Sequence, residues 1–161
     1  MGSKIVFFDR DGVINKEIDR YIEKVEEFEI LPGIGEALST LKQRGYKLVL
    51  VTNQGGIAKG LYGHEEVRTM HAMLQNYLSD FDAQLDLLYY SPHHPDYGNS
   101  LNRKPGSMMV ERGLARLDGD PSQCVIIGDK VRDMDAGAAA GVRGILIEPN
   151  TDIRTILNQI P

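Results

Sequence analysis

Short apolar segments recur five times along the 161-residue chain, and each is followed by a polar or glycine-rich turn. Near-continuous runs of β-branched and aromatic residues of this length are typical of strands that are buried on both faces of a sheet. We therefore expect five strands, at residues 5–8, 47–51, 85–90, 125–127 and 144–147.

Segments with helical periodicity lie between these strands. Ile34, Ala37, Leu38 and Leu41 follow the i, i+3, i+4, i+7 spacing that places apolar side chains on one helix face. The sequence predicts further helices at residues 67–78, 109–117, 133–140 and 151–159. Strands that alternate with helices predict an α/β fold, a Rossmann-like parallel sheet with helices on both faces. No repeat, low-complexity tract or linker divides the chain, so we expect one domain over residues 1–161.

Composition and charge narrow the classes of function. The formal net charge is -5 and the basic residues form no run, so we do not expect a nucleic-acid partner. No apolar stretch reaches membrane-spanning length and no secretory signal is visible, so we expect a cytoplasmic protein without membrane association. The single cysteine, Cys124, lies in an apolar run and is expected to be buried. Nothing in the sequence demands an oligomer, and we expect a monomer.

Parallel sheets of this kind bind ligands beyond the carboxyl ends of their strands, so the residues that follow each apolar run are candidates for chemistry. The first run leads into Asp9-Arg10-Asp11-Gly12. Carboxylates two residues apart on an extended backbone point the same way, so Asp9 and Asp11 can share a site while Arg10 faces away. Asp9 is a candidate nucleophile toward phosphorus, and Asp11 is a candidate proton donor and acceptor. The alternative is a turn with two solvated carboxylates.

Two further runs lead into groups that suit a phosphate. Residues 52–56 read Thr-Asn-Gln-Gly-Gly, and a hydroxyl with successive backbone amides can cradle a phosphate; the alternative is a polar, flexible turn. In the loop after the third run, Lys104 at the mouth of a helix can neutralise a phosphoryl group. The alternative for Arg103 and Lys104 is a pair of solvated side chains.

The fourth run leads directly into Asp129, with Asp133 four residues later. A carboxylate that follows buried apolar residues suits a hard cation such as magnesium, and Asp133 can orient the site from the same helical face. Together, four of the five predicted strands end in residues suited to phosphate chemistry. The sequence therefore favours a magnesium-dependent phosphatase.

The chain resembles the haloacid dehalogenase superfamily of phosphatases over essentially its full length. Within that superfamily it is most similar to the family of D-glycero-D-manno-heptose 1,7-bisphosphate phosphatases and their histidinol-phosphatase relatives. The four motifs that carry the resemblance are Asp9-Arg10-Asp11-Gly12, Thr52-Asn53, Lys104, and Gly128-Asp129 with Asp133. Closer similarity extends over residues 8–15, 51–60, 89–95, 103–105 and 128–130.

This resemblance implies a covalent mechanism in which Asp9 attacks phosphorus and Asp11 acts first as general acid and then as general base. It also implies a magnesium ion held by the carboxylates of Asp9 and Asp129 and the main-chain carbonyl of Asp11, with Asp133 as an orienting neighbour. The residues it assigns to the transferring phosphate are Thr52, Asn53 and Lys104. Those it assigns to the rest of the substrate are Asn53, Gln54, Gly55, Arg103 and Lys130.

Two departures from the superfamily shape the expected site. Too few residues separate the motifs for a folded cap domain, so we expect a capless, open site bordered by the loops at 16–22, 54–62 and 91–104. Relatives commonly hold a structural zinc in the third-motif loop. This chain keeps His93 but has no thiolates there, and we expect no structural zinc. The residues that stand in the thiolate positions are Ser91, Ser100 and Asn102.

Three readings of function remain at this level. The preferred reaction removes the 7-phosphate of a heptose 1,7-bisphosphate, and the alternative substrate is histidinol phosphate. A non-catalytic sensor of phosphate ligands on the same fold is the third reading, because a fold alone does not imply function. Against the sensor stands the presence of every catalytic position. A polynucleotide 3′-phosphatase would need a basic groove, which the sequence does not predict.

Overall fold

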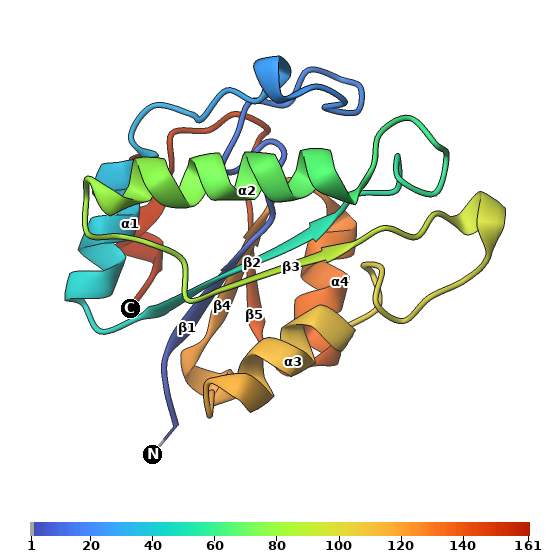
Figure 1. The fold of residues 1–161 in the computed structure, drawn as a ribbon. Coiled ribbons are helices and arrows are strands. Elements are labelled where there is room, and N and C mark those ends of the chain that lie inside the picture. Colours follow the sequence, from blue (N-terminus) through green and yellow to red (C-terminus); the bar gives the residue numbers. More distant parts are fainter. Residues whose placement is uncertain (1) are drawn as a thin grey trace.

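The structure, a computed structural model that describes residues 2–161, is built around a five-stranded sheet. All neighbouring strands run parallel, in the order β3-β2-β1-β4-β5 (Figure 1). The strands are β1 (Ile5–Phe8), β2 (Lys47–Asn53), β3 (Leu87–Ser91), β4 (Val125–Gly128) and β5 (Arg143–Leu146). The predicted α/β fold with a parallel sheet of five strands is confirmed.

Within residues 2–161, four α-helices and four 3-10 helices connect and flank the strands. They are α1 (Ile34–Gln43), α2 (His64–Ser79), α3 (Met108–Arg116), α4 (Val131–Ala139), η1 (Val25–Glu27), η2 (Pro95–Tyr97), η3 (Pro121–Gln123) and η4 (Ile153–Gln159). From the central strand β1, the chain first adds β2 and β3 on one side and then β4 and β5 on the other. Because each crossover between parallel strands is right-handed, this change of direction places the helices of the later crossovers on the opposite face of the sheet from those of the earlier ones. In Figure 1, α2 accordingly lies above the strands and α3 below them.

The central strand β1 shows how the two faces divide the core. Val6 and Phe8 pack into the larger apolar cluster with α1, α2 and η4, whereas Ile5 and Phe7 pack into the smaller cluster with α3. All four side chains are fully buried. This alternation is the period-2 pattern of a strand covered on both sides, as the sequence predicts.

The prediction that every strand is buried on both faces is wrong for the two edge strands, β3 and β5. The side chains of β3 are mostly half-buried, and in β5 only Ile145 is buried. β2 runs two residues further than expected, because Thr52 and Asn53 pair with Tyr90 and Ser91 of β3. β3 and β5 are also displaced from the predicted ranges, and the expected helix at 151–159 is the 3-10 helix η4.

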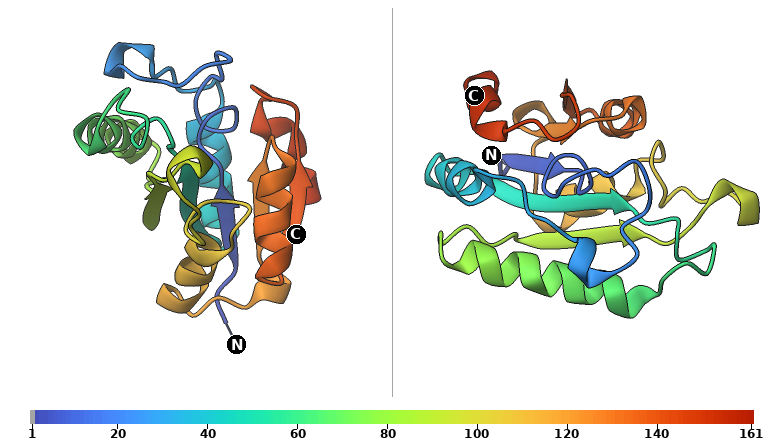
Figure 2. Two further views of the ribbon diagram at one scale, coloured as in Figure 1. Left: turned by 90° about the vertical axis from the view of Figure 1, so that its right-hand side faces the viewer. Right: turned by 90° about the horizontal axis from the view of Figure 1, so that it is seen from above.

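Two long segments leave the sheet at the carboxyl ends of strands. Residues 16–32 lie between β1 and α1 and contain η1, and residues 91–107 run from the last residue of β3 to α3 and contain η2. Figure 2 (right) shows the second of these segments, in yellow, extending beyond the arrowheads of β2 and β3. The same edge carries every candidate catalytic residue. Within residues 2–161, no helix combines the length and the apolar character needed to cross a membrane.

Candidate active site

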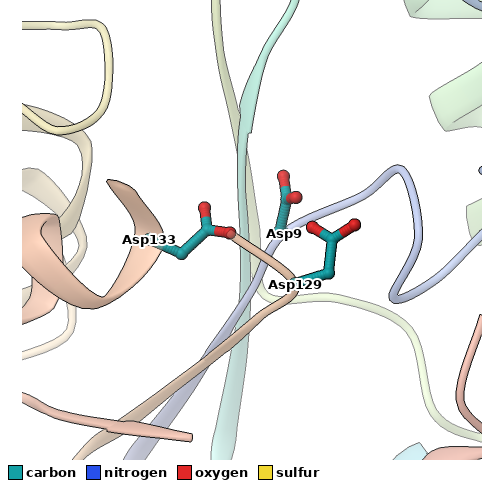
Figure 3. Close-up of side chains that lie close together, drawn as sticks. All are labelled: Asp9, Asp129 and Asp133. Carbon is teal, nitrogen blue, oxygen red and sulfur yellow. The ribbon is translucent and has the colours of Figure 1, made fainter. Parts of the chain in front are cut away.

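Asp9 and Asp129 are brought together by the pairing of β1 with β4. Each is the first residue after its strand, and the backbone N–H of Asp9 donates a hydrogen bond to the carbonyl of Ile127 at 3.0 Å. Asp133 reaches the same point from the first turn of α4. Figure 3 shows the three carboxylates grouped where these elements meet, and one oxygen of each lies within 4.8 Å of the others.

Within residues 2–161, no group donates a hydrogen bond to the carboxylate of Asp129. Both of its oxygens are buried without a hydrogen bond, although Nζ of Lys130 lies 3.9 Å from Oδ2. Burial, and next the charge of Asp9, raise the pKa of Asp129 to about 6. A buried carboxylate without donors is costly unless a cation compensates it. The oxygen-only donors of Asp9 and Asp129 suit a hard divalent cation such as magnesium.

Lys104 lies at the centre of the buried charges. Its Nζ donates hydrogen bonds to Asp9 Oδ1 at 2.9 Å, Asp133 Oδ1 at 2.5 Å and the carbonyl of Val51 at 2.8 Å. Burial opposes a charged ammonium, but the two carboxylates outweigh it and raise the pKa of Lys104. Burial also raises the pKa of Asp9, and Lys104 only partly offsets this effect, because Asp133 and Asp11 add like charge. Lys104 is therefore a fixed cation beside Asp9.

Asp133 differs from Asp129 because both of its oxygens are occupied. Oδ1 accepts from Lys104, and Oδ2 accepts from the backbone N–H of Lys130 at 3.1 Å, which caps α4. Its close approach to β4 requires Gly128, where a Cβ atom would lie 2.3 Å from Cβ of Asp133. The geometry suits Asp133 to hold Lys104 in place.

Asp11 is surrounded by donors. Its carboxylate accepts hydrogen bonds from Arg10 Nε and Nη2, from Asn15 Nδ2 and from Gln54 Nε2. Burial raises the pKa of Asp11, but the charge of Arg10 and these hydrogen bonds outweigh burial and lower it. The expectation that Arg10 faces away from Asp11 is wrong, because the long arginine side chain folds back beneath the loop and reaches the carboxylate.

Gly12 makes room for Asp129. Its φ is +89°, and a Cβ at this position would lie 2.3 Å from Oδ2 of Asp129. A left-handed backbone and the absence of a side chain are therefore both required here.

The residues that follow β2 are tied to one another and to the loop at Lys104. The side chain of Asn53 donates to the carbonyl of Lys104 at 3.0 Å and accepts from its backbone N–H at 2.9 Å. Gln54 donates to Oγ1 of Thr52 at 3.0 Å, and its Oε1 accepts from the Tyr62 hydroxyl at 2.6 Å. Side-chain amides expected to face substrate are thus engaged in fixing the site.

Arg103 lies within the 91–107 loop, and Gly55 lies against it. Nη1 of Arg103 donates to the carbonyl of His93 at 2.8 Å, and a Cβ on Gly55 would lie 2.9 Å from the same nitrogen. The Ser100 hydroxyl accepts from the backbone N–H of Asn102 at 3.1 Å, and the N–H of Met108 donates to the carbonyl of Leu101 at 3.3 Å. The Arg103 bond joins the first part of the loop to the second, and the other two bonds stabilise turns within the second part.

Sequence reasoning missed three residues of the site. Arg10 belongs to the first motif and Asn15 lies three residues after it. Their side-chain directions depend on how the loop curls around the carbonyl of Arg10, which accepts from the backbone N–H groups of residues 13–15. Tyr62 carries no local signal, because only the fold of the 54–62 loop brings its hydroxyl to Gln54. The contacts of Arg10 and Asn15 with Asp11, and of Tyr62 with Gln54, are therefore known from the tertiary structure and not from the sequence.

The profile of the haloacid dehalogenase-like hydrolases matches residues 6–141. The chain belongs to this hydrolase family. It is 34% identical to D-glycero-D-manno-heptose-1,7-bisphosphate 7-phosphatase from Chlorobaculum tepidum, over 98% of this chain and 84% of the relative. It is 39% identical to the D-glycero-beta-D-manno-heptose-1,7-bisphosphate 7-phosphatase of Haemophilus ducreyi, over 89% of this chain and 81% of the relative.

Solved structures give the same relationship. The crystal structure of D,D-heptose 1,7-bisphosphate phosphatase from B. bronchiseptica, complexed with magnesium and phosphate, matches with a TM-score of 0.85 and 32% identity. The match covers 98% of this chain and 88% of that one. The fold and the family assignment therefore rest on independent similarities of sequence and of structure.

Proposed function

We propose that this protein is a magnesium-dependent phosphatase that removes the 7-phosphate of D-glycero-D-manno-heptose 1,7-bisphosphate through an aspartyl-phosphate on Asp9. The observation that carries the proposal is the pairing of Asp9 with the buried cation Lys104, next to the unpartnered carboxylate of Asp129. Relatives at 32–39% identity that bear this activity in their names support the choice of substrate.

Magnesium fits the site because the available donors are oxygens and because neither oxygen of Asp129 accepts a hydrogen bond from the described residues. The carboxylates of Asp9 and Asp129 and the main-chain carbonyl of Asp11 would hold the ion. When bound, magnesium offsets the repulsion between an anionic carboxylate and an anionic phosphate. Every proton transfer is left to residues of the chain.

In the first half of the proposed reaction, a carboxylate oxygen of Asp9 forms a bond to phosphorus while the bond from phosphorus to the sugar oxygen breaks. Asp11 gives its proton to the departing sugar oxygen, so the sugar leaves as an alcohol. Lys104 stabilises negative charge on the transferring group, together with Thr52 and Asn53.

In the second half, Asp11 takes a proton from water and the water oxygen forms a bond to phosphorus. The bond from phosphorus to Asp9 breaks, which releases inorganic phosphate, regenerates the Asp9 carboxylate and leaves Asp11 protonated for the next cycle. Asp133 keeps the ammonium of Lys104 aimed at Asp9 throughout. The remainder of the substrate is assigned to Asn53, Gln54, Gly55, Arg103 and Lys130.

The open edge suits a small sugar phosphate, and we propose that the enzyme acts as a cytoplasmic monomer without structural zinc. In the 91–107 loop, Ser91 and Asn102 offer only neutral oxygen and amide groups, and hydrogen bonds such as Arg103 to His93 link its turns. Structural zinc sites are usually built from thiolates and imidazoles. Metal analysis of the purified protein tests the zinc proposal.

The deciding experiment measures phosphate release with magnesium from both anomers of the heptose bisphosphate, histidinol phosphate and a 3′-phosphorylated oligonucleotide. We expect one heptose anomer to have the highest kcat/KM, since specificity is a ratio of these values. Chelation by EDTA and the variant Asp9→Asn should abolish turnover, and acid quenching should trap phosphate on the wild type only. Retained turnover in Asp9→Asn would disprove the covalent mechanism. A higher kcat/KM for histidinol phosphate than for either heptose anomer would show that histidinol phosphate is the preferred substrate.

A further inference from the structure

Arg10 is a fully buried arginine beneath the catalytic loop. Its guanidinium lies 5.3 Å from the centre of the Phe28 ring, and Nη1 lies 3.7 Å from the sulfur of Met70. Within residues 2–161, Asp11 is the one carboxylate within ion-pair distance of Arg10. Removing one partner of a buried ion pair leaves the other charge uncompensated, which is strongly destabilising. The stability of the buried Arg10 guanidinium therefore depends on Asp11, and that of the Asp11 carboxylate depends on Arg10.

The two oxygens of Asp11 have unequal environments. Oδ1 accepts three hydrogen bonds, from Arg10 Nε at 3.1 Å, Arg10 Nη2 at 2.8 Å and Asn15 Nδ2 at 2.9 Å. Oδ2 accepts one, from Gln54 Nε2 at 3.2 Å. An oxygen that faces three donors has no free lone pair on which to carry a proton. Proton exchange by Asp11 in this orientation therefore has to use Oδ2.

We propose that Arg10 is a positioning residue that fixes the rotation of the Asp11 carboxylate, so that Oδ1 is anchored and Oδ2 exchanges protons with the substrate and with water. This inference rests on the proposed function, in which Asp11 serves as general acid and then as general base. It adds Arg10, whose side chain is fully buried beneath the catalytic loop, to the residues that the reaction requires.

Two neighbours support the assignment. The hydroxyl of Tyr62 donates to Oε1 of Gln54, which turns the amide nitrogen of Gln54 toward Oδ2 of Asp11. His71, whose ring Nε2 is buried without a partner, has a pKa lowered to about 3, by burial first and then by Arg10. His71 is therefore neutral at physiological pH and does not compete with Arg10 as a cationic partner of Asp11.

A lysine cannot reproduce this contact, because two guanidinium nitrogens in one rigid plane hold the same oxygen and an ammonium is a single point charge. Arg10→Lys keeps the charge and most of the volume, and therefore tests geometry. We expect kcat with the sugar phosphate to fall by about 10- to 100-fold in Arg10→Lys, within the range that general acid–base groups contribute, and KM to change by less than about twofold.

A double-mutant cycle separates positioning from a merely structural ion pair. If Arg10 acts through Asp11, then Arg10→Lys should cause no further loss of kcat in an Asp11→Asn background. Losses that multiply in the double variant would overturn the inference. The leaving group gives a second readout, because p-nitrophenolate needs no proton to depart. The phosphorylation burst with p-nitrophenyl phosphate should therefore be almost unaffected in Arg10→Lys.

Two further measurements keep the test decisive if Arg10 variants are unstable or the substrate is wrong. Tyr62→Phe leaves Arg10 intact but frees the Gln54 amide, and we expect a smaller, few-fold fall in kcat. The melting temperature should also fall, because Oε1 of Gln54 loses its buried donor, so kcat is measured well below it. A crystal structure of Arg10→Lys should show a rotated Asp11 carboxylate, and an unchanged Asp11 would overturn the inference at any level of activity. A wild type that releases no phosphate from any substrate would instead disprove the proposed function.

Discussion

Nζ of Lys104 lies 2.9 Å from Oδ1 of Asp9, although 95 residues separate them in the sequence. Both side chains are almost fully buried, and the same ammonium holds Asp133. The parallel sheet brings the end of β1 to the loop that follows β3, so a candidate nucleophile acquires a fixed cation. The consequences of this arrangement are measurable.

The first prediction concerns Lys104. Lys104→Met leaves two carboxylates buried without their cation, so we expect the free energy of unfolding to fall by about 3–5 kcal/mol and kcat by at least about 100-fold. Denaturant unfolding and steady-state kinetics measure the two effects.

Lys130→Met is the matched control. It removes the same charge from a side chain that is 45% exposed, and its effect on stability should be below about 1 kcal/mol. Adding Asp133→Asn to Lys104→Met should recover part of the lost stability. Equal effects of the two lysine variants would show that the buried ion pairs do not stabilise the fold.

The second prediction concerns Asp129 without metal. Because the folded-state pKa of about 6 lies above the usual aspartate value, the folded state binds the extra proton and loses stability as pH rises from about 4 to about 6. At pH 7.5 in EDTA, Asp129→Asn should therefore melt at a higher temperature than the wild type, with no activity. A lower melting temperature would contradict an uncompensated charge at Asp129.

The third prediction is the pH dependence of magnesium binding. Carboxylate ligands must be ionised to bind the ion, and the pKa values of Asp9 and Asp129 are both raised. The increase in melting temperature caused by magnesium should be small at pH 5 and should reach its full size by about pH 7.5. Differential scanning calorimetry across this range measures it. A shift of equal size at pH 5 would contradict these pKa directions.

The fourth prediction compares two glycines that share a left-handed backbone. Gly12 and Gly141 have φ of +89° and +77°. A Cβ atom added to Gly12 would lie within 3 Å of the Asp129 carboxylate, whereas the nearest atom to a Cβ on Gly141 belongs to Pro121, at 3.5 Å. Each change to alanine should cost about 1–2 kcal/mol of stability through the backbone. Gly12→Ala alone should also weaken magnesium binding, because the methyl group displaces the Asp129 carboxylate. Calorimetric titration with magnesium distinguishes the two variants.

Local sequence patterns predicted most of the fold. Runs such as Ile5–Phe8 are apolar on both faces, and their ends mark where polar residues can meet. The patterns failed at strand boundaries and edges, where pairing partners decide. Thr52 is strand rather than loop because it pairs with Tyr90, and β5 is mostly exposed because it lies at the edge of the sheet. Neither fact is encoded within a few residues of the position.

The sequence by itself determined which residues meet at the carboxyl edge of the sheet, because parallel topology brings the ends of successive strands together whatever their side-chain contacts. Asp9, Asp129 and Lys104 follow from that rule. Only the tertiary structure decided what each side chain does there, since long side chains choose among rotamers according to the donors and acceptors around them. Arg10 turns toward Asp11, Asn53 binds the backbone of Lys104, and Asp129 is left with two oxygens free. Which partner satisfies each buried polar group depends on the packing of the entire domain, so no local sequence pattern specifies these hydrogen bonds.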